Sequence, residues 1–283
     1  MERNPINDLS ETRFKRVEWV SEIESTNTEL LRRARREAPE GEVLIADLQT
    51  AGRGRRGRVW EAPARSSLMM SILLRPPPTA FKISQISLFT SALALAAISA
   101  IQELTGITLQ VKWPNDLVID SIEPRTSPVD GDFGYRKIAG ILTETVIVGR
   151  EVNALVIGIG INTDWPEVPP HLEFQASSLN LICGKKTDRD LLSKKILINL
   201  ERRYFELLQG GGTNKLLKEL KSNSATLHKQ VKVEMSTAAG PMSVIEGTAI
   251  DIDNDGQLLI RLINGDEKTI NVGDVHHLRP LPR

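Results

Sequence analysis

The sequence predicts an α+β fold, in which mixed strands and hairpins are flanked by helices and followed by a small all-β barrel. Residues 81–104 and 189–208 have the composition of long helices, and the first segment is rich in Ala, Leu and Ile. Two β-rich runs, 137–148 and 152–161, are joined by the turn Gly149-Arg150. Such paired runs favour an antiparallel hairpin rather than a parallel crossover.

The N-terminal half predicts further short elements in chain order. Ser25 to Thr28 supply cap candidates for a helix over residues 29–37. The chain is broken at Pro76-Pro77-Pro78, before the first long helix. Strands are expected over residues 43–48, 67–74, 108–113 and 117–120.

The last part of the chain, from about residue 227, has a different pattern. Its apolar runs are short and are separated by turn signals such as Asn264-Gly265, and Asn-Gly between apolar runs is a strong hairpin signal. The runs are 231–235, 244–252, 257–263 and 268–272. Four or five short strands of this kind predict a small barrel. We therefore expect two domains, residues 1–222 and residues 223–283.

Composition restricts the class of protein. The chain has 283 residues, 40% hydrophobic and 25% charged, with a formal net charge of zero. A dedicated nucleic-acid binder usually carries a basic surplus, so the balance argues against one. A single cysteine, Cys183, excludes an internal disulfide and is expected to pack as a small apolar side chain.

The sequence also predicts a cytoplasmic location. Residues 1–14 are polar and lack the apolar stretch of a secretion signal. We expect no window to approach the ~18 apolar residues that span a membrane. The apolar residues 92–101 are instead interpreted as part of a buried helix.

The segment Gly52-Arg53-Gly54-Arg55-Arg56-Gly57-Arg58-Val59-Trp60, here called the Gly–Arg loop, is the most informative stretch of the chain. It holds four arginines and three glycines in seven residues, followed by a tryptophan two positions later. Glycine lets the backbone approach a ligand closely, and arginine binds phosphate or carboxylate through two parallel N–H groups. Trp60 offers a flat face for a planar ring. The alternatives are a solvated basic turn and a nucleic-acid patch.

The spacing of the three glycines also matches the dinucleotide-binding fingerprint. That fingerprint requires a helix at the last glycine and an acidic residue about 20 positions later. Here the chain continues through Pro63 into a strand, and neither Leu73 nor Arg75 is acidic. We therefore reject a dinucleotide-binding turn and expect a mobile ligand loop between two strands.

Three further motifs carry candidate chemistry. Pro114 forces an extended Trp113 and directs Asn115 and Asp116 to the end of a strand, although an ordinary turn would look the same. Lys137 precedes a glycine-containing buried strand, where an ammonium could neutralise a carboxylate or phosphate; a lysine that merely flanks a strand is the alternative. The alternating glycines of Gly158-Ile159-Gly160-Ile161-Asn162 indicate that a backbone or a flat group passes close to this strand.

The residues of these motifs and their order along the chain resemble those of the biotin protein ligases. The family pattern runs S-T-N, then Q-x-x-G-R-G-R-x-G-R-x-W, K-W-P-N-D, K-x-A-G-I-L and G-I-G-x-N. This chain matches it at Ser25-Thr26-Asn27, at Gln49 with residues 52–60, and at residues 112–116, 137–142 and 158–162. The resemblance covers about residues 17–208 and the small barrel behind them. It implies a mixed sheet similar to that of class II aminoacyl-tRNA synthetases, followed by an SH3-like barrel.

The resemblance implies a reaction in two steps. Biotin and MgATP would give biotinyl-5′-AMP and pyrophosphate, and the biotinyl group would then pass to one lysine of a biotin carboxyl carrier protein. Joining two anions requires positive charge where they meet, and a closing loop would keep the adenylate away from water. Mg²⁺ would bridge phosphates and keep several waters.

The resemblance implies a role for each residue that matches a family motif. The ureido head of biotin would be bound by Ser25, Thr26, Asn27 and Gln49. The biotin tail and acyl-phosphate would be covered by Arg53, Gly54 and Arg55, with Arg55 also retaining the adenylate. Lys137 would contact the biotin carboxylate and acyl-phosphate, so Arg55 and Lys137 are the catalytic candidates. The ATP side would comprise Arg55, Trp60, Asn115, Asp116 and Asn162, with Asp116 the one candidate metal ligand.

Two departures from the family pattern matter. Many bacterial members carry an N-terminal helix-turn-helix domain, whereas 24 residues precede Ser25 here, which is shorter than such a domain. The chain thus resembles the monofunctional type, with no operator binding expected. Residues 121–135 form a longer connection than is usual, interpreted as a surface loop that either is merely tolerated or touches the carrier or a dimer partner.

Three other functions compete with biotin ligation. A lipoate–protein ligase shares the fold and the adenylation logic, but the Gly–Arg loop and Lys-Trp-Pro-Asn-Asp motif favour biotin. A biotin-responsive DNA-binding repressor needs the additional N-terminal domain. A nucleic-acid module predicts steeply salt-dependent binding, which the neutral charge disfavours. The chain could be a monomer or a homodimer.

Overall fold

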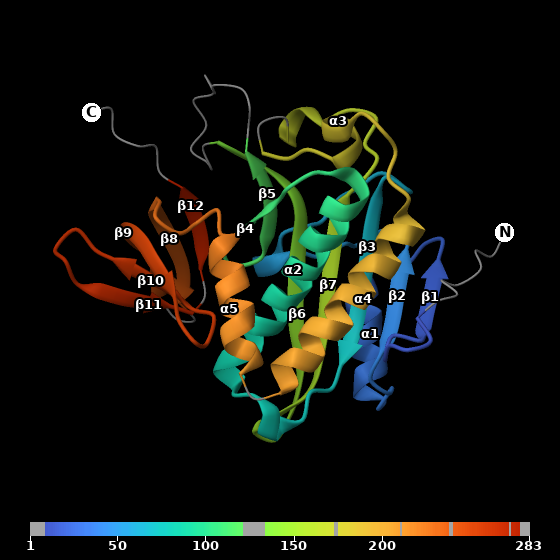
Figure 1. The fold of residues 1–283 in the computed structure, drawn as a ribbon, viewed down its shortest axis with the longest axis horizontal. Helices are drawn as coiled ribbons and strands as arrows, with labels where there is room; N and C mark the ends of the chain where they lie inside the picture. Colours follow the sequence, from blue (N-terminus) through green and yellow to red (C-terminus); the bar gives the residue numbers. More distant parts are fainter. Residues whose placement is uncertain are drawn as a thin grey trace.

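A seven-stranded mixed sheet forms the centre of the larger part of the protein (Figure 1). The computed structural model describes residues 9–120, 134–172, 175–209, 211–237, 240–271 and 273–277. The order is β1-β2-β3-β7-β6-β5-β4, with β1 and β2 parallel and every other neighbouring pair antiparallel. The strands are β1 (Arg16–Val20), β2 (Glu42–Ala46), β3 (Ser67–Leu74), β4 (Gln110–Lys112), β5 (Asp116–Asp120), β6 (Tyr135–Val148) and β7 (Glu151–Asn162).

Helices cover both faces of this sheet. Alternation along a strand sends successive side chains to opposite faces. Thus Val43 and Ile45 join the core beneath the long helices α2 (Ile86–Thr105) and α4 (Arg189–Leu208), which lie side by side in Figure 1. Leu44 instead packs with Leu30 and Leu31 of α1 (Thr26–Arg35) on the other face. Two shorter helices, α3 (Leu179–Cys183) and α5 (Gly212–Ser222), complete this part.

Helix α2 corrects one sequence-based expectation. Together with the preceding 3₁₀ turn it forms the segment Ile83–Thr105, which is long and apolar enough to cross a membrane by length and composition. The expectation that no window approaches that length was therefore wrong. Of the apolar 18-residue window within this segment, 67% is buried inside the protein. This is typical of a core helix, and α2 packs against the sheet and against α4.

Five antiparallel strands form a second sheet, in the order β11-β10-β9-β8-β12. They are β8 (Gln230–Thr237), β9 (Gly240–Ile252), β10 (Leu258–Arg261), β11 (Glu267–Ile270) and β12 (Asp274–His277). Hydrogen bonds join this sheet to the larger part. The indole Nε1 of Trp113 donates to the carbonyl oxygen of Gly256 at 3.0 Å, and the Ser87 hydroxyl donates to that of Asp255 at 2.8 Å.

The expected elements agree closely with the observed ones. The strand over 67–74 and the helix over 189–208 have the predicted bounds, and the residues 137–161 form the predicted hairpin. The sequence interpretation missed β1, α3, α5 and β12. Cys183 is half-buried and packs against the core as expected. Most of the connection 121–135 lies outside the described residues.

Candidate active site

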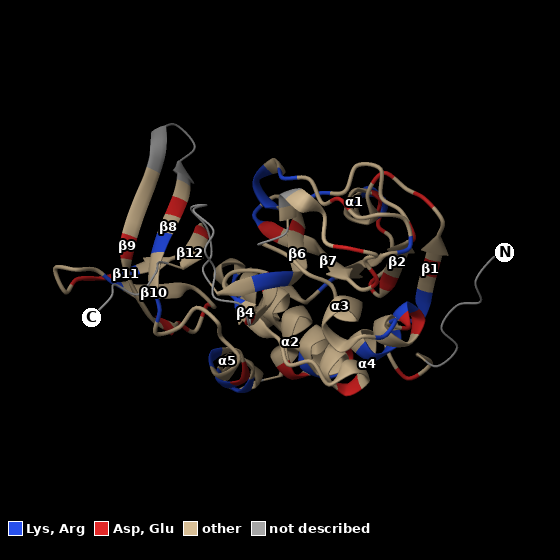
Figure 2. Cartoon of the chain, turned by 90° about the horizontal axis from the view of Figure 1, so that it is seen from above, with Lys and Arg blue, Asp and Glu red and all other residues tan. Residues whose placement is uncertain are grey.

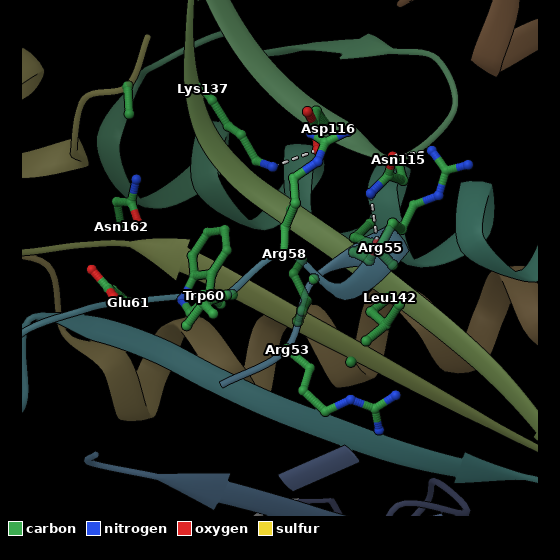
Figure 3. Close-up of a pocket in the computed structure, with 18 of the residues that line it drawn as sticks. Arg53, Arg55, Arg58, Trp60, Glu61, Asn115, Asp116, Lys137, Leu142 and Asn162 are labelled. Atoms are coloured by element: carbon green, nitrogen blue, oxygen red, sulfur yellow. Dashed lines mark hydrogen bonds and ion pairs between the residues drawn. The ribbon is translucent and has the colours of Figure 1, made fainter. Parts of the chain in front are cut away.

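A cavity of about 850 Å³ lies beneath the Gly–Arg loop, over the glycine-containing strands β6 and β7 (Figure 3). The structure brings all the sequence-predicted site residues to its walls. They are Ser25, Thr26, Asn27, Gln49, Arg53, Gly54, Arg55, Trp60, Asn115, Asp116, Lys137 and Asn162. These predicted residues, which lie up to 137 positions apart in the chain (Ser25 to Asn162), thus line one site.

An uncharged polar cluster forms one end of the cavity. The Gln49 side-chain oxygen accepts from the backbone N–H of Thr26 at 2.8 Å and from its hydroxyl at 3.0 Å. The Ser71 hydroxyl lies 2.7 Å from that of Thr26 and donates to Asn27 Oδ1 at 2.6 Å. Ser25 is the N-cap of α1, so the same backbone turn that starts the helix presents Thr26 and Asn27 to the cavity. These buried groups suit an uncharged head rich in hydrogen-bonding atoms.

The Gly–Arg loop is a closed turn between β2 and β3. Its ends are joined by an antiparallel bridge between Arg53 and Val59, and Gly54 N–H donates to the Arg58 carbonyl at 2.8 Å. Between them runs a 3₁₀ turn, Arg55–Gly57, in which Arg56 has a φ of +56°. Gly52 is required because a Cβ there would lie 2.3 Å from the backbone oxygen of Trp60. The loop therefore presents its arginines from a defined backbone.

Three of the loop's arginines converge on one carboxylate of the second sheet. Asp274, at the start of β12, pairs with Arg56 at 3.0 Å and with Arg58, and its other oxygen lies 3.8 Å from Arg55. Arg55 also donates to Asn115 Oδ1 at 3.1 Å and to the Gly273 carbonyl at 3.3 Å. Three guanidiniums share one carboxylate, which leaves an excess of positive charge for an incoming anion.

Burial lowers the pKa of Arg55, and the nearby carboxylate of Asp116 opposes this shift. An arginine remains protonated under such a shift, so Arg55 is a permanent cation at the cavity wall. Its attraction for an anion is stronger here than on the open surface, because less water screens the charge.

Lys137 supplies a second cation at the same end of the cavity as Arg55. Its Nζ lies 2.7 Å from Asp116 Oδ1 and 5.5 Å from the centre of the Trp60 ring. Figure 3 shows Lys137 and Asp116 pointing toward one another above Trp60. Asp116 is the first residue of β5, directly after the turn that contains Pro114, and its carboxylate lines the cavity as predicted.

The glycines of β6 and β7 are explained by the side chains that lie on them. A Cβ at Gly160 would lie 2.5 Å from Cε2 of the Trp60 ring, and one at Gly158 would lie 2.1 Å from Asn27 Oδ1. The predicted close approach to this strand is therefore confirmed, with the Trp60 indole and the Asn27 amide as the approaching groups. The indole Nε1 of Trp60 and Oδ1 of Asn162 are buried without a hydrogen-bond partner among the described residues. Both line the cavity and can serve a ligand.

The Arg53 side chain is placed differently from the sequence-based interpretation, which put it over an anionic tail. Its guanidinium pairs with Glu144 Oε1 at 2.8 Å and points away from Lys137 and Asp116 (Figure 3). Glu144, Ser71 and Asp274 were not singled out from the sequence. The one available signal was that Glu144 is the single acidic residue of β6.

The described residues contain no group of three His, Cys, Asp or Glu side chains that could hold a metal ion. Three carboxylates nevertheless line the cavity: Glu61, Asp116 and Asp274. This donor set fits a Mg²⁺ ion held mainly by substrate phosphates and water, with a single protein carboxylate, rather than a dedicated metal cage.

The two ends together define what the cavity can do. One end offers neutral hydrogen-bonding groups, and the other offers Arg55, Arg58 and Lys137 near a planar indole (Figure 3). Figure 2 shows a basic turn, coloured for Lys and Arg, beside β6. Such a site can hold a ligand with a polar head and a carboxylate tail beside a nucleotide, and can neutralise both anions as they react.

Comparisons with known proteins agree with this chemistry. Residues 19–162 match the biotin/lipoate A/B protein ligase family, and residues 226–278 match the biotin protein ligase C-terminal domain. The bifunctional ligase/repressor BirA of Bacillus subtilis is 34% identical over 252 residues, which cover 88% of this chain and 69% of that protein. The biotin–[acetyl-CoA-carboxylase] ligase of Mycobacterium tuberculosis is 30% identical over 269 residues, covering 94% and 90%.

A solved structure is also similar along nearly the whole chain. The biotin protein ligase of Aquifex aeolicus in complex with biotin and ATP superposes with a TM-score of 0.74 at 27% identity. The match covers 94% of this chain and 100% of that one.

Proposed function

Because the chain belongs to the biotin/lipoate A/B protein ligase family, we propose that it activates biotin with ATP and attaches it to a carrier protein. The observation that carries the proposal is the cavity itself, with an uncharged hydrogen-bonding end next to two convergent cations, Arg55 and Lys137. Relatives named biotin–[acetyl-CoA-carboxylase] ligase support the biotin carboxyl carrier protein of that carboxylase as the protein substrate.

In the first step a biotin carboxylate oxygen attacks the α-phosphate of ATP. A new P–O bond forms, the bond to the β-phosphate breaks, and pyrophosphate leaves. Arg55 and Lys137 neutralise the two anions as they meet, which is where preorganised charge lowers the barrier. In the second step a neutral lysine amine of the carrier attacks the acyl carbon, AMP leaves, and the amine loses a proton.

The polar cluster is proposed to bind the biotin head through Ser25, Thr26, Asn27 and Gln49. The support is that Ser25, Thr26 and Asn27 are buried, that Gln49 is half-buried beside them, and that all four are uncharged, as a neutral ureido ring requires. Gly54 allows the loop backbone to lie close over the tail, beside Arg55 and Lys137.

The nucleotide is proposed to lie on the side of Arg55, Trp60, Asn115, Asp116 and Asn162. Trp60 Nε1 and Asn162 Oδ1 are buried and have no hydrogen-bond partner in the described part of the chain, which supports a base with both donor and acceptor atoms at this end. Mg²⁺ would be held by the phosphates and water with Asp116 as its protein carboxylate, and it would supply charge neutralisation to the leaving pyrophosphate.

We further propose residues 1–222 as the catalytic domain and residues 223–283 as the C-terminal domain, in the cytoplasm, acting as a monomer or a homodimer. We propose no sequence-specific DNA binding. The net charge of zero supports this, as does the pairing of four loop arginines with carboxylates.

A pyrophosphate-release assay with purified protein and MgATP tests the proposal. We expect release that depends on biotin, and labelling of the carrier protein detected with streptavidin. Release with lipoate but not with biotin would instead make the protein a lipoate ligase.

A further inference from the structure

The carboxylate of Glu144 contacts both the polar cluster, at Asn27, and the Gly–Arg loop, at Arg53. Glu144 follows Leu142 by two positions on β6, so both side chains point to the cavity face of the sheet. Its Oε2 accepts from Asn27 Nδ2 at 3.1 Å, and its Oε1 accepts from Arg53 Nη2 at 2.8 Å. The Glu144 side chain is 21% exposed, so water screens these contacts only in part.

On the side of the polar cluster, Glu144 fixes the orientation of the Asn27 amide. Asn27 Nδ2 donates to Glu144 and to the Leu142 carbonyl, each at 3.1 Å, while its Oδ1 accepts from Ser71 at 2.6 Å. Gly158 leaves the necessary space beneath Oδ1. Without Glu144, one of the two acceptors of the Asn27 NH₂ group is lost.

On the side of the loop, Glu144 holds the first arginine. Arg53 pairs with it and also donates to the Thr28 hydroxyl at 3.3 Å, and its side chain is 47% exposed. Arg53 is therefore directed along the rim of the cavity rather than toward Lys137. Its charge does not face the phosphate end of the site.

We propose that Glu144 is a positioning residue that links the Gly–Arg loop to the polar cluster. The link, here called the tether, consists of its ion pair with Arg53 and its hydrogen bond from Asn27. The inference rests on the proposed biotin ligation. The loop is then anchored at two points by carboxylates, at Glu144 near the biotin head and at Asp274 near the nucleotide. Loss of the first anchor loosens Asn27 and the loop over the biotin tail, while the Asp274 anchor remains.

Steady-state kinetics of Glu144→Ala, Glu144→Gln, Arg53→Ala and the double alanine variant test the tether. Glu144→Ala should raise the KM for biotin about tenfold, the size expected when one charge-assisted network is removed, with kcat and the KM for ATP changed by less than about threefold. Glu144→Gln keeps a neutral acceptor for Asn27 and should raise the KM for biotin less. The double variant should have the same KM for biotin as Glu144→Ala, because both substitutions remove the same ion pair.

Limited trypsin digestion gives a second readout, because the loop holds four potential cleavage sites. Ligand-free Glu144→Ala and Glu144→Gln should both be cut in the loop faster than the unmodified protein. Glu267→Gln is the matched control, since Glu267 pairs with Arg261 at 2.9 Å on the second sheet, and should change neither readout.

Unchanged biotin KM and unchanged loop cleavage in both Glu144 variants would overturn the inference. Additive effects in the double variant would also overturn it. So would a fall in kcat together with a rise in both KM values, which indicates general damage to the active site. If the unmodified protein releases no pyrophosphate with biotin, the proposed function fails. The trypsin comparison then still decides whether Glu144 anchors the loop.

Discussion

The side-chain ammonium of Lys137 lies 2.7 Å from Oδ1 of Asp116, at the end of the cavity that also holds Arg55. The pair keeps a lysine in the site at a defined position without a ligand, with Asp116 as its counter-charge. An incoming carboxylate or phosphate can share or replace that partner at little cost of reorganisation, which is the condition for electrostatic catalysis.

Lys137→Ala should slow adenylate formation much more than it weakens ATP binding. The ammonium acts where charge develops, so its loss should lower the single-turnover rate by about 10²-fold, while the Kd for ATP changes by less than about threefold. Preloaded substrates in a quench-flow experiment separate the two quantities. Lys268→Ala, at an exposed position on β11, is the control. Equal single-turnover rates for Lys137→Ala and the unmodified protein would contradict this role.

Arg55→Gly should release biotinyl-5′-AMP before transfer. Arg55 connects the loop to Asn115 and to the Gly273 carbonyl, so its removal opens the cover over the adenylate. We expect roughly tenfold more biotin on bystander proteins such as serum albumin, equivalent to about 1.4 kcal/mol of lost retention. Streptavidin blots measure it, with Arg202→Gln, exposed on α4, as the control. Bystander labelling at the unmodified level would refute retention by Arg55.

Asp274→Asn should loosen the loop from the second sheet. Arg56 and Arg58 both pair with this carboxylate, so a neutral amide removes the charge that holds them. Trypsin should then cut the ligand-free loop faster, and ATP with biotin should restore protection. Asp266→Asn, in the turn after β10 of the same sheet, should leave the cleavage rate unchanged. Identical cleavage of Asp274→Asn and the unmodified protein would mean that the loop does not depend on β12.

The backbone of the site could be predicted from the sequence because its signals are local. Glycine is needed where a backbone or ring passes close, and proline fixes the strand end at Pro114, so Gly158, Gly160 and Asp116 could be assigned before their partners were known. The long helix over 189–208 follows in the same way from its composition.

The residues that anchor the loop could not be predicted, because their contacts are distant in sequence. Asp274 lies 218 positions from Arg56, and Glu144 lies 91 positions from Arg53. A carboxylate in a strand gives no indication of which arginine it will face. The same limit explains β1, whose short mixed sequence forms a strand only because it pairs with β2.

Glu29→Gln should destabilise the protein near neutral pH but not in strong acid. A hydrogen bond from Arg32 lowers the pKa of Glu29 from 4.5 to about 2, with Arg33 adding to the shift. Since the folded pKa is the lower one, the stabilisation is full above pH 4.5 and is lost as the pH falls toward 2.

Surface pairs of this kind contribute about 0.5 kcal/mol, so the free energy of unfolding of Glu29→Gln should be lower by about that amount at pH 7. Urea titrations at several pH values measure the difference. Glu22→Gln, at an exposed position before the same helix, should show no such pH-dependent loss. A constant penalty down to pH 2 would show that the side chain acts through packing instead of charge.

Gly160→Ala and Gly158→Ala should separate the two ends of the site. A Cβ at Gly160 would come within 2.5 Å of the Trp60 ring, so Gly160→Ala should displace the indole and raise the KM for ATP more than that for biotin. A Cβ at Gly158 would come within 2.1 Å of Asn27 Oδ1, so Gly158→Ala should do the reverse. Overpacking of either kind should also cost about 1–3 kcal/mol of stability.

Both variants are measured by substrate kinetics and by tryptophan fluorescence, which should change more for Gly160→Ala. Gly149→Asn is the control, because a Cβ there meets no atom within 4 Å and Asn tolerates its φ of +64°. The crossed pattern of the two KM values is the decisive result. If both variants raised the two KM values equally, Trp60 and Asn27 would not serve different substrates, and the division of the cavity into a nucleotide end and a biotin end would be wrong.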